Sequence, residues 1–475
     1  MGERRAGRRV RRCGTRIAPV VSRSCTGVEF SIKRPSSVHR GRVSRRREAA
    51  MNELPEVLWS NEPHAGDYIN SVAVSDDGNV IVAGTFFHDY GDTTQTSGLD
   101  AVPVEQRKVF ERIAPAATRS DVGNDQQGCY GTYAWDGAGN LLLKKEFEGW
   151  QGVYWVDVAG DGGTMASCGW KSQQPYAGFI GAWAVSGGKE LLSYALPGRG
   201  NMVSLDARGQ TLLAGAEQGY LFCREGDASF GAPVCIALSA GGTGDSADSV
   251  IATGLAADGT IGLVASAQGE IILFSIAAGQ PGTLTRWQLP KQARVHAAAL
   301  SGDGRRAYAG ASDGTLYAFD VAAFQKTPGP AWTETVPEGA TTIYGVACDR
   351  AGNKAAIAGN LKGGGVVAVY ADAGTAATLQ WTAHSAHSPN CLAFDPDGRW
   401  LGLADGHPDG TPGGFTLWNA VDGTALWSYG TDNMSWPIRL NSGATVVVGG
   451  SDDGSVTAFA GPGSAIGRGR AESDG

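Results

Sequence analysis

Two short motifs in the chain have the spacing of a catalytic or metal-binding site. Gly310-Ala-Ser312-Asp-Gly314 fits the Gly-x-Ser-x-Gly pattern of a serine nucleophile, but that chemistry requires a turn between a strand and a helix. The residues on both sides alternate as strands do, so we interpret the match as a hairpin turn. His384 and His387 have the i, i+3 spacing of metal ligands on a helix, yet they lie in an expected connection between strands. No Cys or carboxylate cluster accompanies them, so we interpret His387 as structural and expect no metal or other cofactor.

Aspartate-rich segments suggest a second kind of chemistry, the binding of calcium. Asp395-Pro-Asp397-Gly398 and Asp452-Asp453-Gly454 resemble the beginning of a calcium loop. Such a loop places a Glu six residues after its Gly, and these positions hold Ala404 and Ala460. Asp and Gly also form tight turns, because Asp bonds to nearby backbone and Gly adopts a positive φ. We therefore expect turns at both places.

These turns belong to a sequence phrase that recurs eight times. In residues 298–320 it consists of an apolar strand, an Asp-Gly turn, a second strand ending in small residues and a strand with aromatic residues. The turn glycines are Gly78, Gly162, Gly209, Gly259, Gly304, Gly352, Gly398 and Gly443. They lie 45 to 50 residues apart, except for a first step of 84. Such a period predicts an all-β fold, a single eight-bladed β-propeller with four-stranded antiparallel blades. Seven blades is the alternative if the stretched first unit is aberrant.

The last repeat lacks its outermost strand, and the beginning of the chain supplies a matching segment. After Phe459 only a short Gly-Pro segment and a polar tail remain, whereas Glu56–Ser60 matches Ala425–Ser428 of the preceding repeat. We expect residues 56–60 to complete the last blade and so close the ring. The third strand of each unit carries a core aromatic residue: Tyr133, Trp183, Phe222, Phe274, Phe319, Tyr370, Trp418 and Phe459.

One position near the start of each inner strand is expected at the mouth of the axial funnel. It lies two residues before the first core apolar residue, and side chains two apart share a face. The aligned residues are Asn70, Tyr154, Asn201, Ile251, His296, Tyr344, Asn390 and Trp436. Seven of the eight can hydrogen-bond or stack, which is typical of a binding site. The alternative is that strand-entry residues are polar because they lie near solvent.

Charge divides the chain at Met51. Of 39 Lys+Arg and 47 Asp+Glu, residues 1–50 hold 15 and 3, which leaves 24 and 44 for the rest. An acidic body repels phosphate, so we expect no nucleic-acid partner. Residues 1–50 lack the apolar core of a secretory signal, and we interpret them as a disordered extension before the true start at Met51. An organellar transit peptide is the alternative. No run of ~18 apolar residues predicts a membrane span.

The expected domain organisation is a propeller over residues 51–460, with a disordered tail over 461–475. An insertion at about 88–128, in which 104–113 has a helical pattern, is a candidate binding loop. The alternative is a solvated excursion from one blade. The eight cysteines include no Cys-x-x-Cys or vicinal pair. We expect free, buried thiols in the cytoplasm, with the periplasm as the alternative.

Two families of propellers resemble different parts of the chain. Ala386–Gly398, followed by Leu417-Trp418-Asn419, resembles a WD-repeat blade, whereas Asp313–Asp320 and Asp453–Phe459 are similar to repeats of pyrroloquinoline-quinone-type propellers. Most repeats lack the Gly-His and Trp-Asp dipeptides, so the chain resembles a divergent bacterial member over about 56–460. The resemblance implies a soluble, non-catalytic interaction scaffold. Quinone dehydrogenases of the second family use a vicinal disulfide, and the chain has no Cys-Cys pair.

The function that we expect is non-catalytic binding of a protein or a small ligand at the funnel face and the insertion. The alternative is a quinone-dependent oxidoreductase, or another enzyme whose active site is the funnel. His296 is the only imidazole on the ring of aligned residues and would be the first candidate for acid–base chemistry. The sequence gives no indication of the oligomeric state.

Overall fold

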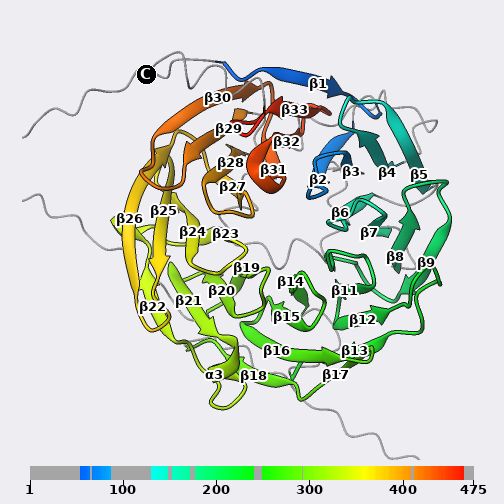
Figure 1. Ribbon diagram of the computed structural model, residues 1–475. Helices are drawn as coiled ribbons and strands as arrows, with labels where there is room; N and C mark the ends of the chain where they lie inside the picture. The colour runs from blue at the N-terminus through cyan, green and yellow to red at the C-terminus, as the bar shows by residue number, and fades with distance from the viewer. Residues whose placement is uncertain are drawn as a thin grey trace, which may run out of the picture. The chain divides into compact units, whose positions relative to one another are not determined.

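Eight antiparallel blades close into a ring, which confirms the predicted eight-bladed propeller (Figure 1). The computed structural model describes residues 54–64, 67–86, 130–147, 152–171, 177–239, 249–290, 293–407 and 411–464. The whole of the expected insertion 88–128, which includes the expected helix 104–113, lies outside this part of the chain, as do residues 1–50 and 465–475. The interpretations given to them stay predictions.

Blades 1 to 4 follow the chain, each running from its inner to its outer strand. Blade 1 contains β2 (Tyr68–Val74), β3 (Val80–Phe86), β4 (Tyr130–Asp136) and β5 (Leu141–Phe147). Blade 2 contains β6 (Val153–Val158), β7 (Thr164–Lys171), β8 (Ala177–Ala184) and β9 (Glu190–Leu196). Blade 3 contains β10 (Met202–Leu205), β11 (Thr211–Gly215), β12 (Gly219–Cys223) and β13 (Val234–Ile236). Blade 4 contains β14 (Val250–Leu255), β15 (Ile261–Ser266), β16 (Glu270–Ala277), β17 (Gln280–Pro281) and β18 (Thr285–Gln288).

Blades 5 to 8 repeat this order and include three short helical turns. Blade 5 contains β19 (Val295–Leu300), β20 (Arg306–Ala311), β21 (Thr315–Asp320), α3 (Val321–Phe324) and β22 (Trp332–Thr335). After η2 (Pro337–Gly339), blade 6 contains β23 (Ile343–Cys348), β24 (Lys354–Leu361), β25 (Gly364–Asp372) and β26 (Ala377–Ser385). Blade 7 contains β27 (Pro389–Phe394), β28 (Trp400–His407), β29 (Thr411–Asn419) and β30 (Ala425–Thr431). Blade 8 contains β31 (Ser435–Leu440), η3 (Ser442–Ala444), β32 (Val446–Ser451), β33 (Val456–Ala460) and β1 (Val57–Asn61).

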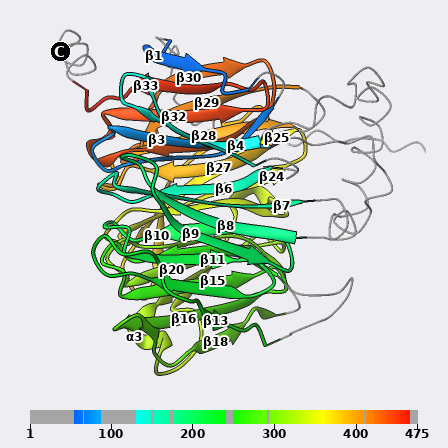
Figure 2. The same cartoon turned by 90° about the vertical axis from the view of Figure 1, so that its right-hand side faces the viewer.

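The first turn of every blade has the conformation that its glycine predicts. All eight turn glycines have φ between 61° and 75°, a region that residues with a Cβ adopt only with strain. Backbone hydrogen bonds link most neighbouring turns; for example, the N–H of Ala207 donates to Ala257 O at 2.9 Å, and that of Ala257 donates to Gly302 O at 2.8 Å. The turns therefore form a nearly continuous belt on the face that carries α3, which is the left-hand side of Figure 2.

The N-terminal strand completes the last blade, as predicted. β1 pairs antiparallel with β33, with Val57 opposite Phe459 and Asn61 opposite Val456. Trp59 extends the contact to blade 1, because its Nε1 donates to Gly137 O at 3.2 Å and its ring lies 5.9 Å from that of Trp135. One strand thus fastens the two ends of the ring.

The hydrophobic core consists of layers between neighbouring blades. The eight predicted aromatic residues of the third strands are all less than 5% exposed. Tyr133, for example, shares a cluster with Val448 and Ala458 of the neighbouring blade 8. Because each layer is buried only when two blades meet, the ring stabilises every blade through both of its neighbours.

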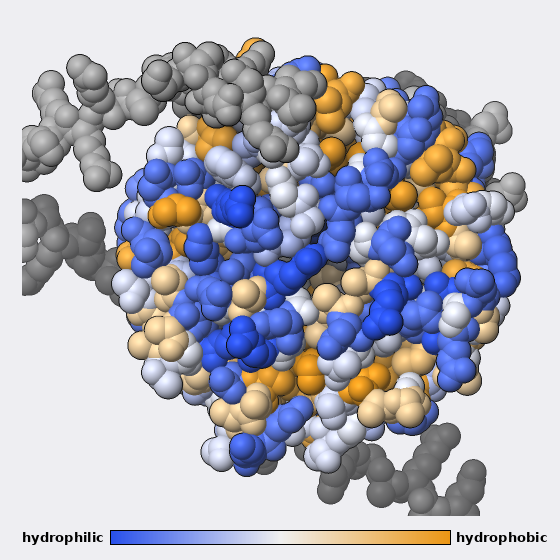
Figure 3. Space-filling view, viewed as in Figure 1, coloured by the Kyte–Doolittle hydropathy of each residue, from blue (hydrophilic) through white to orange (hydrophobic). Residues whose placement is uncertain are grey.

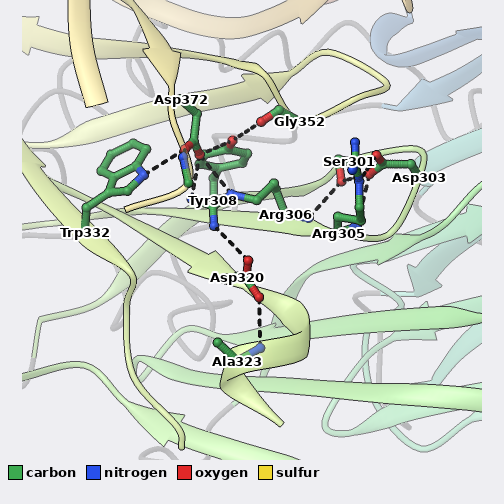
Figure 4. A network of polar contacts seen from close by, with 11 residues as sticks. Ser301, Asp303, Arg305, Arg306, Tyr308, Asp320, Ala323, Trp332, Gly352 and Asp372 are labelled. Atoms are coloured by element: carbon green, nitrogen blue, oxygen red, sulfur yellow. Dashed lines mark hydrogen bonds and ion pairs between the residues drawn. The ribbon is translucent and has the colours of Figure 1, made fainter. Parts of the chain in front are cut away.

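A charged network supplements the apolar contact between blades 5 and 6 (Figure 4). Asp372, at the end of β25, is 2.6 Å from Nη2 of Arg306 in β20. Its carboxylate also accepts hydrogen bonds from Tyr308 Oη at 2.7 Å and Trp332 Nε1 at 3.1 Å. A buried carboxylate with three donors is fully compensated, so this network holds the two blades in one register.

The prediction of buried cysteines is confirmed in full only at Cys168, because Cys223, Cys348 and Cys391 are half-buried and Cys235 is exposed. Cys235 is exposed because it lies on the outermost strand of blade 3. These five described cysteines are free thiols. Within the described part of the chain, no helix is long and apolar enough to cross a membrane.

Candidate functional site: the axial channel

β-Bulges direct the predicted mouth residues toward the ring axis. In β6 the pairing register shifts between Val153 and Trp155, so Tyr154 is the extra residue and has no partner in β7. Seven of the eight inner strands have a bulge at the aligned position: at Asn70, Tyr154, Ile251, His296, Tyr344, Asn390 and the Trp436-Pro437 pair. The eighth residue, Asn201, immediately precedes β10. A bulge bends the strand and re-aims a side chain, which places this position at the channel wall.

All eight aligned residues line one axial cavity of about 1080 Å³. The structure therefore brings together Asn70, Tyr154, Asn201, Ile251, His296, Tyr344, Asn390 and Trp436. Their part in binding stays a prediction. Their surroundings divide them into groups with different chemistry.

The three asparagines connect neighbouring blades. Asn70 Nδ2 donates to Tyr154 O at 2.5 Å, Asn201 Nδ2 to Val250 O at 2.8 Å, and Asn390 Nδ2 to Ser435 O at 2.9 Å. In each case the acceptor is a backbone carbonyl of the next inner strand. These amides thus have a structural role that explains their polarity without a ligand.

The aromatic residues of the ring contact cations or each other. Arg199 lies over the ring of Tyr154, with its Cζ 4.6 Å from the centroid, and His296 lies 5.2 Å from Tyr344. Burial and the neighbouring Arg294 both lower the pKa of His296, so its imidazole is neutral at pH 7. Trp436 is 38% exposed. These side chains leave π faces and a neutral imidazole at the mouth.

Arg439 is a channel residue that the sequence interpretation missed. Its Nη1 donates to Cys391 Sγ at 3.2 Å and to Ile438 O at 2.8 Å, and its Cζ lies 5.4 Å from the ring centroid of Trp155. Because Trp155 belongs to blade 2 and Arg439 to blade 8, the side chain reaches past blade 1. The guanidinium therefore lies inside the cavity, which Arg439 and Trp155 both line.

A signal for Arg439 exists in the repeat itself. The residue between the two core apolar positions of each inner strand is Ala73, Asp157, Ser204, Gly254, Ala299, Ala347, Ala393 or Arg439. Six blades have a small residue there, and two have charges of opposite sign. Asp157 accepts hydrogen bonds from the N–H groups of Leu205 at 2.7 Å and Val158 at 2.9 Å. Burial raises the pKa of Asp157 to about 6, although these bonds and the charge of Arg439 oppose the rise.

An ion pair crosses the ring at the end opposite the mouth. Arg350 Nη2 lies 3.0 Å from Oδ1 of Asp76. The two residues come from the turns of blades 6 and 1, which are not neighbours, so their side chains meet across the axis. Figure 3 views this face and shows hydrophilic residues around a small central hollow. The ion pair therefore spans the axis at the turns, at the end of the ring opposite the bulges.

The channel wall is suited to binding and offers little for metal chemistry. Among the described residues, no group of three His, Cys, Asp or Glu side chains could hold a metal ion. His384, one of the two histidines with metal-ligand spacing, lies 2.8 Å from Glu338 instead. The Gly310–Gly314 match to a nucleophile motif lies between β20 and β21, as the hairpin interpretation predicted.

Comparisons with known proteins support the fold. A family model described as "WD domain, G-beta repeat" matches residues 377–411. The crystal structure of Sqt1 from Saccharomyces cerevisiae matches with a TM-score of 0.60 and 12% identity, over 86% of this chain and 99% of that one. The β-propeller domain of Cps50 (Swd1) from Myceliophteria thermophila matches with a TM-score of 0.47 and 14% identity, over 64% of this chain and 95% of that one. No curated protein matches the sequence. The fold and the matched repeat define a WD-repeat-like β-propeller.

Proposed function

We propose that the protein is a non-catalytic platform that binds a partner at the mouth of the axial channel. The observation that carries this proposal is the bulge that recurs in seven inner strands and aims Tyr154, His296, Tyr344 and Trp436 into one cavity. Bulges of this kind are common next to functional sites. Aromatic residues in a concave site are the usual anchors of protein interfaces.

The rigidity of the wall supports the same function. Each inner strand belongs to a blade fixed by its two neighbours, and three asparagines fasten the strands to one another at the mouth. A preorganised surface loses little conformational entropy when a partner binds. The likeness of one segment to a WD-repeat blade also favours the role of an interaction scaffold. We assign the protein to the cytoplasm.

An enzyme that uses the channel is a second candidate, favoured by one contact. The imidazole of His296 is neutral at pH 7, and its ring centroid lies 5.2 Å from that of Tyr344, so the cavity holds a group that could act as a general base. A quinone-dependent oxidoreductase is a narrower version of this alternative. Substitution of His296 by Gln tests this candidate, because an enzyme that uses the imidazole for proton transfer would lose turnover.

The test is capture of a partner by the full chain from its own host, followed by native mass spectrometry. Tyr344→Ala with Trp436→Ala should abolish capture. The matched control is Leu379→Ala with Val421→Ala, since both residues are exposed away from the channel. Retention of the partner by the channel variant would refute the platform. A bound small molecule or metal in the native mass would support the enzyme instead.

A further inference from the structure

We propose that the channel binds an acidic peptide segment of the partner, with Arg439 pairing its innermost carboxylate. This inference rests on the proposed function and adds the chemistry of the partner. It depends on the charge of the lining, the spread of the cations and the contacts of Arg439.

The charge of the lining is opposite to that of the body. Acidic residues outnumber basic ones 44 to 24 after residue 50. Yet the described lining contains three arginines, which carry its positive charge, three histidines, of which His296 is neutral at pH 7, and no Asp or Glu. The basic residues are Arg199, Arg294, Arg439, His296, His387 and His407. A concave site lined by one sign of charge focuses the field and attracts the opposite charge.

The cations are distributed around the channel. Arg199 precedes β10 in blade 3, Arg294 precedes β19 in blade 5, and Arg439 lies in β31 of blade 8. The side chains of Arg199 and Arg439 both reach blade 2, at Tyr154 and Trp155, whereas Arg294 belongs to blade 5. An extended chain with several carboxylates can contact all three cations. The volume of about 1080 Å³ is also at the upper limit of the range of ~300–1,000 Å³ that small-molecule pockets occupy.

Arg439 has contacts that leave its charge available to a ligand. Its two hydrogen bonds go to a thiol and a carbonyl oxygen, which are neutral groups. The neighbouring carboxylate of Asp157 accepts its hydrogen bonds from backbone N–H groups of β6 and β10. A guanidinium stays protonated and has five donors, so further donors of Arg439 can pair with an incoming carboxylate.

An apolar strip of the channel wall indicates what the rest of the bound peptide should contain. Leu300, Val346, Leu392 and Phe394 of blades 5 to 7 line the same cavity. The matching peptide carries apolar residues next to its acidic ones. The acidic body repels long polyanions, so the channel admits a short acidic segment and discriminates against nucleic acid.

The experiment uses the immobilised full chain and a library of decapeptides randomised among Glu, Phe, Leu and Gly. The matched library has Lys in place of Glu. We expect the protein to retain acidic peptides only. Its affinity for them should fall at least tenfold in Arg439→Met, and it should also fall at least tenfold when NaCl is raised from 50 to 500 mM. The control Arg350→Met, at the opposite end of the ring, should retain them. Equal retention of both libraries, or of acidic peptides by Arg439→Met, would overturn the proposal.

Alkylation by iodoacetamide locates the peptide. Cys391 lines the channel and contacts Arg439, whereas Cys235 is exposed on blade 3. Retained peptides should slow the alkylation of Cys391 at least fivefold and leave the rate of alkylation of Cys235 unchanged. Equal protection by 10 mM inorganic phosphate would identify a site for small anions and refute the peptide. If Tyr344→Ala with Trp436→Ala loses the captured partner but Arg439→Met retains it, the platform stands and the acidic segment is wrong.

Discussion

Arginine has different roles in the contacts between neighbouring blades, which we call joints, and in the wall of the channel. At the joint of blades 5 and 6, Arg306 pairs with Asp372, and their side chains are only 7% and 1% exposed. In the channel, Arg439 bonds to a thiol and a carbonyl oxygen. The first cation forms an ion pair within the fold, whereas the second makes its hydrogen bonds to neutral groups and has Asp157 only as a neighbouring carboxylate. The comparison indicates that charge at the joints contributes to a fixed structure, and that charge in the channel is available for binding.

The difference has an energetic basis. Removing one partner of a buried ion pair leaves an uncompensated charge, which costs far more than the pair itself contributes. Arg439 is only half-buried, and solvent can stabilise a cation that stays partly exposed, so its substitution leaves no buried charge unpaired. Substitutions at the joints should therefore change stability, and substitutions in the channel should change binding.

The largest effect is expected at the joint that closes the ring. Deletion of residues 51–62 removes β1 and leaves the edge of β33 unpaired. Because no other strand covers this edge, we expect a sharp fall in the melting temperature and a tendency to aggregate. Differential scanning calorimetry measures the first and light scattering the second. An unchanged melting temperature would show that β1 does not fasten the ring.

The next largest effect is expected for Asp372→Ala. This change leaves Arg306 without its counter-ion and removes the acceptor of Tyr308 and Trp332. We expect a loss of about 3–5 kcal/mol in the free energy of unfolding, measured with urea. Asp227→Ala on an exposed turn is the control and should change it by less than about 0.5 kcal/mol. A loss as small as that of the control would contradict the account of the joint.

Asn201 tests the comparison further, because its side chain lines the channel but its amide connects two neighbouring blades. Asn201→Ala leaves Val250 O without its side-chain donor, and we expect a loss of about 1–3 kcal/mol in unfolding free energy. Binding of the partner should persist. Asn79→Ala on an exposed turn is the control. If Asn201→Ala abolished binding with stability intact, the amide would belong to the site.

The smallest effect concerns pH. Burial raises the pKa of Asp157 to about 6, so between about pH 4 and 6 the native state holds a proton that the unfolded state has released. This group therefore stabilises the fold fully below about pH 4, and its contribution is lost as the pH rises to about 6. Asp157→Asn should remove this dependence, an effect on the order of 1 kcal/mol. Urea unfolding of both proteins from pH 4.5 to 7.5 measures the effect. If the free energy of unfolding depended on pH in the same way in the original protein and in Asp157→Asn, the assignment would be contradicted.

The sequence predicts the joints well because they repeat. Each turn requires a glycine with positive φ, and each blade requires an aromatic residue in its third strand, so eight copies make both visible. The match of Glu56–Ser60 to a preceding outer strand revealed the closing strand in the same way. The aligned ring of mouth residues also follows from the repeat, since all eight reach the cavity.

The channel was harder to predict because its contacts join blades that are distant in sequence. Arg439 reaches Trp155 past an intervening blade, and Asp76 meets Arg350 across the ring. Neither contact follows from the period of the repeat, which describes one blade and its neighbours. The bulges also could not be predicted from one residue type, because Asn, Tyr, Ile, His and Trp all occupy the bulged position. Departures from the repeat, such as a charge where other blades have Ala, were the usable signal.

The closing strand has a mechanical consequence. β1 begins at Val57 beside Phe459, close to the end of β33, and the two strands run antiparallel. A force that separates the two ends of the propeller therefore loads the β1–β33 hydrogen bonds one at a time, as a zipper opens, rather than all together. The ring that resists heat through this strand should open at low force when it is pulled by its ends. A tether on any other blade would shear several strands at once and would meet greater resistance.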